Sequence, residues 1–155
     1  MSLFVLDTDI ATLYQAGHET VCRRVLETPE ADLAISIISV EEQLSGWYAL
    51  LRKAKTPSEL AAVYASMTRS VSSLSRLTIL SFTEPAIDRY VALRAMKLNL
   101  GKMDLRIAAI VLEQGAILVT RNARDFSRIP GLNFENWADA PGIAPIGTAP
   151  TPPSS

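Results

Sequence analysis

Acidic residues follow apolar runs at several places along this chain. In the stretch LFVLDTDI, residues 3–10, four apolar residues are followed by Asp7 and Asp9. Carboxylate oxygens are the ligands that hard divalent cations such as Mg²⁺ and Mn²⁺ prefer. The other acids placed next to apolar runs are Glu41, Glu42, Asp104 and Asp125. These residue types predict a metal site, provided that the fold brings them together.

The elements that would position these acids alternate between strands and helices. Apolar runs rich in β-branched residues predict strands over residues 3–6, 33–39, 77–82 and 116–120. Helical spacing and capping signals predict helices over residues 9–16, 19–27, 40–54, 57–74, 84–98 and 104–114. The helix at residue 57 is the clearest, because Thr56, Pro57 and Glu59 form a capping box with proline at the first helical position. The alternation predicts an α/β sandwich with a mainly parallel central sheet of four to five strands.

This sheet would bring the acids to one edge, because ligands of open parallel sheets bind at the carboxyl ends of the strands. Asp7 follows the first strand, and Glu41 and Glu42 follow the second. Asp125 lies in the loop after the fourth strand, and Asp104 begins the helix that precedes this strand. Crowded carboxylates raise one another's pKa, and a divalent cation relieves their repulsion. We therefore expect a metal site at this edge.

Each acid also has a structural explanation. Either acid of LDTDI can cap the first helix, and Ser39 with Glu42 can form a capping box. Asp104 can be a helix N-cap, and Asp125 can cap a helix or form a turn in NARDF. The four signals gain weight only because they meet at one predicted edge.

Length and composition limit the possible protein classes. The chain has 155 residues, of which 48% are hydrophobic, and this fits one globular domain. No apolar run is long enough for a membrane span, and the first residues lack the charged region of a signal peptide. The single cysteine, Cys22, excludes a disulfide within the chain, so the cytoplasm is the expected compartment. Residues 139–155 are rich in Pro, Ala and Ser, which predicts a flexible tail after a domain over residues 1–138.

Charge is unevenly distributed along the chain, although the net charge is only −1. Residues 1–50 carry eight acids and two bases, whereas residues 94–128 carry seven bases and three acids. Such a division would let one surface hold a metal while another contacts a polyanion, although a mixed solvated surface explains it equally well.

Three blocks of sequence resemble PIN-domain endoribonucleases, most closely the VapC-type toxins of toxin–antitoxin modules. The blocks are LDTDI, ISVEEQLSG and DLRIAAIVLEQGAILVTRNARDFSRIPGLNFENW. The family's acidic ligands fall at Asp7, Asp104 and Asp125, and counting back from Gly46 places the remaining one at Glu42. Glu41 remains a rival, because its helical position lies nearer the apolar stripe of its helix.

The resemblance implies a PIN-like three-layer sandwich and a Mg²⁺- or Mn²⁺-dependent endoribonuclease, with a small antitoxin and a second copy of the chain as partners. The four acids would hold the cation. Thr120 and Asn122 can orient the site by hydrogen bonds, although a structural turn explains them equally well. Several basic residues near the acids are candidates for contact with the RNA backbone. These residues are Lys102, Arg106, Arg121 and Arg124.

Two other functions stay open. A strand that ends in Asp-x-Asp also begins haloacid-dehalogenase-like phosphatases, although Ala11 stands where that family has Thr or Val. A catalytically silent PIN fold that only binds a partner is the second alternative. The apolar positions of the helices near Trp47 and Tyr64 predict core packing, although they can equally offer a contact surface.

Overall fold

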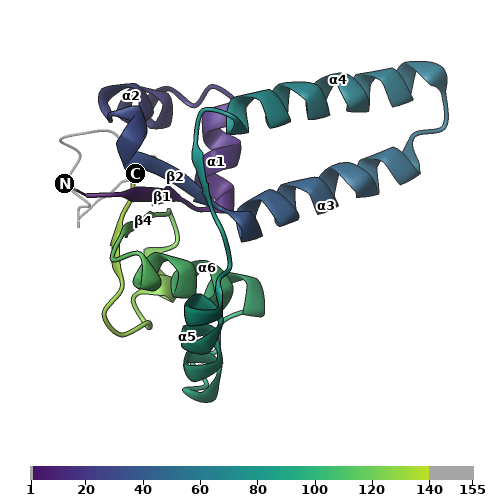
Figure 1. Ribbon diagram of the computed structural model, residues 1–155. Helices are drawn as coiled ribbons and strands as arrows, with labels where there is room; N and C mark the ends of the chain where they lie inside the picture. Colours follow the sequence, from purple (N-terminus) through teal and green to yellow (C-terminus); the bar gives the residue numbers. More distant parts are fainter. Residues whose placement is uncertain (1, 140–155) are drawn as a thin grey trace.

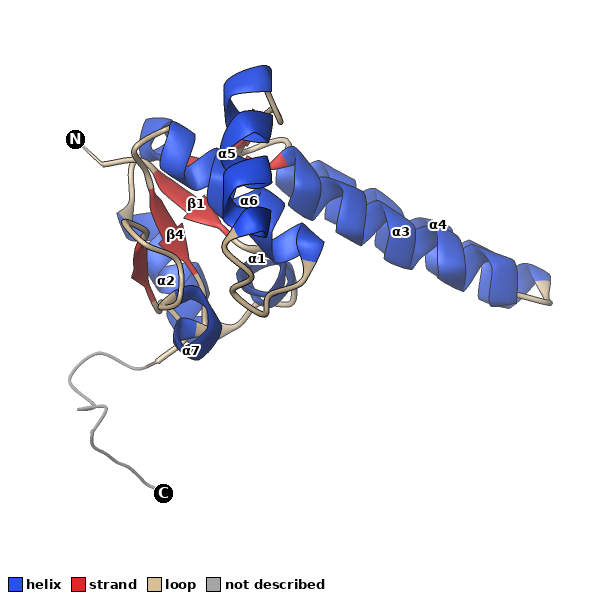
Figure 2. Ribbon diagram, turned by 90° about the horizontal axis from the view of Figure 1, so that it is seen from below, coloured by secondary structure: helices blue, strands red, loops and turns tan. Residues whose placement is uncertain are grey.

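The central sheet of the computed structural model has five parallel strands in the order β3-β2-β1-β4-β5. The structure describes residues 2–139, and Figure 2 shows the strands enclosed by helices. The strands are β1 (Phe4–Leu6), β2 (Leu33–Ser36), β3 (Thr78–Leu80), β4 (Ile117–Val119) and β5 (Asn133–Glu135). The expected parallel α/β sheet is therefore confirmed.

Seven α-helices and one short 3-10 helix occupy the described residues. They are α1 (Thr8–Gln15), α2 (Glu19–Glu27), η1 (Glu30–Asp32), α3 (Ile37–Lys53), α4 (Pro57–Leu74), α5 (Glu84–Ala95), α6 (Lys102–Glu113) and α7 (Ala123–Phe126). None of these helices is long and apolar enough to cross a membrane.

Strand residues alternate between two hydrophobic cores, one on each face of the sheet. Val5 and Leu118 pack on the face covered by α5 and α6. Leu6 and Val119 pack on the opposite face, with residues of α1 and α2. Figure 1 shows α1 and α2 above the sheet and α5 and α6 below it, which confirms the three-layer sandwich.

The second strand is shorter than the sequence predicts. It ends at Ser36, whose side-chain oxygen accepts a hydrogen bond from the backbone N–H of Ser39 at 3.1 Å and caps α3. Residues 37–39 are therefore helical, although their apolar and β-branched composition favours a strand. The explanation of Ser39 and Glu42 as a capping box is wrong, because α3 begins at Ile37, three residues earlier than that motif requires.

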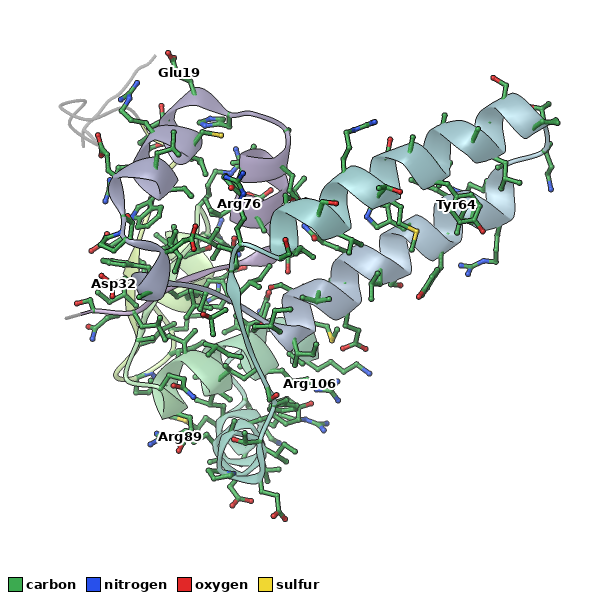
Figure 3. All side chains as sticks on the ribbon, turned by 45° about the horizontal axis from the view of Figure 1, so that its top comes forward. Glu19, Asp32, Tyr64, Arg76, Arg89 and Arg106 are labelled. Carbon is green, nitrogen blue, oxygen red and sulfur yellow. The ribbon has the colours of Figure 1, made fainter. Side chains whose placement is uncertain are left out.

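The helices α3 and α4 form a hairpin that projects from the body of the molecule (Figure 1). The predicted capping box of Thr56 and Glu59 is present at the start of α4. The apolar positions at helical spacing along α4 predict packing in the core, and this prediction is largely wrong. Leu60, Tyr64 and Val71 are exposed, and of this apolar stripe only the last residue, Leu74, is buried. Tyr64 lies on the projecting part, away from the sheet (Figure 3).

The C-terminal part of the domain contains two elements that the sequence does not signal, α7 and β5. The predicted tail, apart from Asp139, lies outside the described residues.

Candidate active site

A cavity of about 480 Å³ lies where the order in which strands are added to the sheet reverses. The chain adds β2 and β3 on one side of β1, and then β4 and β5 on the other side. The crevice beyond the carboxyl ends of the strands at such a switch point is the usual ligand site of open α/β sheets. The cavity is lined by Asp7, Thr8, Asp9, Glu42, Asp104, Ile107, Arg121, Asn122 and Phe126.

Asp7 connects the strand β1 to the helix α1 and is only 8% exposed. One of its carboxylate oxygens accepts a hydrogen bond from the backbone N–H of Ile10 at 2.8 Å, so Asp7 is the N-cap of α1. Burial raises its pKa to about 6, although hydrogen bonds from Thr120 and Ile10 act in the opposite direction. The negative charges of Asp9 and Asp104 raise the pKa further. The capping explanation is thus correct, and the same carboxylate also lines the cavity.

Glu42, rather than Glu41, lines the cavity. The hydroxyl of Thr8 donates a hydrogen bond to Glu42 and lies 2.9 Å from the hydroxyl of Ser39. Glu41 instead borders a separate groove beside Val40. Helical spacing correctly predicts that Glu41 lies beside the apolar stripe of α3. Counting back from Gly46 correctly selects Glu42 as the glutamate at the cavity.

Asp104 lies in the first turn of α6 and lines the same cavity. Its pKa is raised by burial first, and then by the charges of Glu42 and Asp125. The N-cap explanation is wrong, because α6 begins at Lys102 and Gly101 occupies the capping position.

Asp125 lies at the rim, in the short helix α7, and is not among the residues that line the cavity. The side-chain amide of Asn122 donates a hydrogen bond to its carboxylate at 2.9 Å, and Arg128 forms an ion pair with it at 3.5 Å. Asn122 also caps α7 and lines the cavity, while Thr120 is fully buried. The predicted orienting residues are therefore close to the acids.

The structure brings only one of the four predicted backbone-contacting bases to the cavity, and this is Arg121. Lys102 and Arg124 are exposed and do not line it. Arg106 does not line it either, because its guanidinium lies 5.2 Å from the ring centroid of Tyr90, towards α5. A residue two positions after Asp104 on a helix points about 200° away from it.

Asp9 is the cavity residue whose role the sequence suggests least, since it stands beside Asp7 in LDTDI but the family resemblance places the acidic ligand at Asp7. Its two carboxylate oxygens accept hydrogen bonds from Nε of Arg121 at 2.7 Å and from Nη2 at 3.3 Å. The two residues are 112 positions apart, so no local pattern announces the pair.

The cavity fits Mg²⁺ or Mn²⁺ by the chemistry of its donors. Asp7, Glu42 and Asp104 supply carboxylate oxygens, and no His or Cys from the described residues lines the cavity, which disfavours zinc. No group of three or more His, Cys, Asp or Glu side chains in residues 2–139 is arranged to enclose a metal ion directly. Mg²⁺ commonly binds through one or two carboxylates and keeps several waters, so a closed protein cage is not required.

Comparisons with known proteins agree with this architecture. The PIN domain model matches residues 4–132. Ribonuclease VapC2 of Rickettsia felis is 31% identical over 141 residues, covering 87% of this chain and 98% of that protein. The tRNA(fMet)-specific endonuclease VapC of Shigella flexneri is 26% identical over 142 residues, covering 89% of this chain and 100% of that protein.

Solved structures give the same result. VapBC2 from Rickettsia felis, bound to a DNA fragment from its promoter, matches with a TM-score of 0.71 at 29% identity, covering 87% of this chain and 98% of that one. DNA-bound VapBC from Salmonella typhimurium matches with a TM-score of 0.74 at 26% identity, covering 88% and 99%. The chain therefore belongs to the PIN-domain family, and within it is similar to the VapC ribonucleases.

Proposed function

We propose that this protein is a Mg²⁺- or Mn²⁺-dependent endoribonuclease and the toxin of a toxin–antitoxin pair. One observation carries the proposal: Asp7, Glu42 and Asp104 come from distant segments and line one cavity at the switch point of the sheet. Relatives named as ribonucleases match nearly the whole domain, and this supports RNA as the substrate class. Membership of the PIN family excludes the phosphatase alternative.

The side chains of the cavity have separate tasks in this reaction. A divalent cation held at these acids would supply an activated water for in-line attack and would stabilise the leaving oxygen. Asp7, Glu42 and Asp104 would hold the cation directly or through its bound waters, with Asp125 as a fourth acid at the rim. The contact with Thr8 orients the carboxylate of Glu42.

Fixed contacts hold these groups before substrate binds. Asp7 is held by the backbone N–H of Ile10 at 2.8 Å, and Thr120 is held by its own backbone N–H, which donates to the carbonyl of Glu135 at 2.9 Å. Asn122 holds Asp125 at 2.9 Å. Preorganised groups of this kind need little rearrangement in the transition state.

The proposal includes two protein partners. Several similar solved structures are toxin–antitoxin complexes, which supports a small antitoxin that covers the site and keeps the toxin inactive. The second partner is another copy of the chain. Exposed apolar residues of the projecting hairpin, such as Tyr48, Tyr64 and Val71, offer surface for such contacts. The protein would act in the cytoplasm, where RNA and antitoxin are available.

Cleavage of purified RNA, with a tRNA pool as the first substrate, tests the proposal. We expect Mg²⁺ or Mn²⁺ to support cleavage and EDTA to abolish it. Asp7→Asn and Asp104→Asn should each lower the rate roughly 10²-fold or more, since they remove groups that stabilise charge in the transition state. Glu41→Gln is the matched control and should cleave normally. If the parent protein bound RNA but never cleaved it with either cation, it would be a silent binding module.

A further inference from the structure

The mouth of the cavity carries an ion pair that neither the fold nor the acid site requires. Asp9 is in the first turn of α1, and Arg121 directly follows Thr120 at the end of β4. Their contact is bidentate, and both side chains are about half exposed, at 51% and 50%. Exposed ion pairs contribute little to stability, so stability alone does not explain this one.

Arg121 is the only basic residue among residues 2–139 that lines the cavity. Four of the other lining residues are acids, and an RNA phosphate that approaches them meets repulsion that Arg121 can offset. An arginine has five N–H donors in a rigid fork that matches phosphate geometry. Asp9 takes two of these donors, and the remaining ones on Nη1 and Nη2 have no hydrogen-bond partner among residues 2–139.

Both ends of the pair are held by rigid structure. Thr120 is fully buried, its hydroxyl accepts a hydrogen bond from the backbone N–H of Asn122 at 2.9 Å, and this fixes the chain on either side of Arg121. Asp9 lies two residues after Asp7, the N-cap of α1. Holding a long side chain in place before binding lowers the entropy lost when it contacts a ligand.

We propose that Asp9 is a positioning residue that holds Arg121 at the mouth of the cavity with its outer edge directed to a phosphate of the RNA strand. The inference rests on the proposed function for the identity of the substrate. Asp9 acts through Arg121 and does not bind the cation, whereas Arg121 contacts the substrate.

The sign of the effect of Asp9→Asn separates this role from simpler ones. Removing an acid from the mouth should strengthen RNA binding if only net charge matters. Loss of positioning should weaken it, because the asparagine side chain is neutral and holds the guanidinium less firmly. We expect Arg121→Ala to raise the KM for RNA roughly tenfold, and Asp9→Asn roughly threefold, with kcat within about twofold of the parent in both.

A double-mutant cycle gives the second readout. Asp9→Asn combined with Arg121→Ala should be no worse than Arg121→Ala alone, since a positioning residue has no effect without the group that it positions. Asp9→Glu should restore part of the affinity. Arg121→Ala should also flatten the salt dependence of RNA binding by about 0.7 in log K against log salt, the value for one phosphate contact on a single strand.

The pair of Arg89 and Glu113 is a matched control. It joins α5 and α6 at 2.7 Å, with side-chain exposures of 50% and 32%. Glu113 ends α6, so it lies near the start of β4 and opposite the carboxyl edge that holds the cavity. Arg89, its partner, also lies away from the projecting hairpin of α3 and α4 (Figure 3). Arg89→Ala and Glu113→Gln should leave KM unchanged.

Binding of a labelled single-stranded RNA in EDTA, measured by fluorescence anisotropy, keeps this inference separate from the proposed function. If the parent never cleaves RNA, the proposed function fails, and weaker, non-additive binding by the two variants still supports the role of Asp9. Unchanged or tighter binding by Asp9→Asn would overturn that role even in an active enzyme. Additive losses in the cycle, or a loss of Mg²⁺ affinity as large as that of Asp104→Asn, would overturn it as well.

Discussion

Replacing Asp7 by asparagine should stabilise the protein at neutral pH when no divalent cation is present. The pKa of Asp7 is raised from 3.8 to about 6, mainly by burial. Each pKa unit corresponds to about 1.4 kcal/mol, so the ionised carboxylate costs the folded state about 3 kcal/mol at pH 7. Asparagine is as good an N-cap as aspartate, but it loses the attraction of a charge to the start of α1, about 0.5 kcal/mol. The net gain expected is about 2.5 kcal/mol.

The pH dependence gives the sign of this effect. The folded protein binds the proton of Asp7 more tightly than the unfolded chain does, so folding takes up protons between pH 3.8 and about 6. This contribution to stability is complete below pH 3.8, falls as the pH rises through the window, and is lost above about 6. Asp7→Asn removes the dependence, so its advantage over the parent should be absent near pH 3.5 and constant above pH 7.

Urea unfolding in EDTA at a series of pH values measures the difference directly. Asp88→Asn, which makes the same chemical change at an exposed position of α5, is the control and should shift stability by less than about 0.5 kcal/mol. If the variant were less stable than the parent at pH 7.5, or if its gain in unfolding free energy did not change with pH, the charge of Asp7 would not destabilise the folded state.

Three further changes test neighbouring parts of the site. Asp104→Asn should weaken Mg²⁺ binding, measured by calorimetry. The stability of the metal-free protein should stay equal or rise, because the pKa of Asp104 is raised by burial and by nearby acids. A clear loss of that stability would contradict the metal role. Glu42→Ala should lower the rate of RNA cleavage roughly 10²-fold or more, with Glu41→Ala within a few-fold of the parent. The reverse ranking would mean that Glu41 is the active glutamate. Ser36→Ala should destabilise the protein by about 1 kcal/mol in urea unfolding, since it removes the N-cap of α3. An unchanged stability would show that packing alone, and not this cap, fixes where α3 begins.

Those parts of the fold that depend on local signals were predictable from the sequence. The run before Asp7 is apolar because β1 is covered on both faces, and the capping box at Thr56 marks the start of α4 correctly. Gly115 ends α6 with a φ of +60°, a conformation in which glycine is favoured. The meeting of the acids followed from the direction of parallel strands, without knowledge of the strand order.

Other features depend on contacts that no local pattern encodes. The strand β5 has only three residues, Asn133–Glu135, which are too few for their alternation to signal a strand, and it pairs with the edge that β4 offers. The stripe of α4 has the spacing of a buried helix face, yet the hairpin carries most of it away from the sheet, so periodicity alone does not distinguish a core from a contact surface. The pair of Asp9 and Arg121 needs a sheet order that places β4 beside β1.

The structural and chemical explanations of the acids are therefore compatible. Asp7 caps α1 because a strand that ends in a helix needs an acceptor there, and the cap leaves the rest of its carboxylate facing the cavity. The same geometry turns Asp9, in the first turn of that helix, towards Arg121 at the end of the neighbouring strand. One junction between β1 and α1 thus places two acids, one buried beside other acids and one exposed beside a base. Their different surroundings, rather than their spacing in the sequence, are the reason why we propose cation binding for the first and positioning of Arg121 for the second.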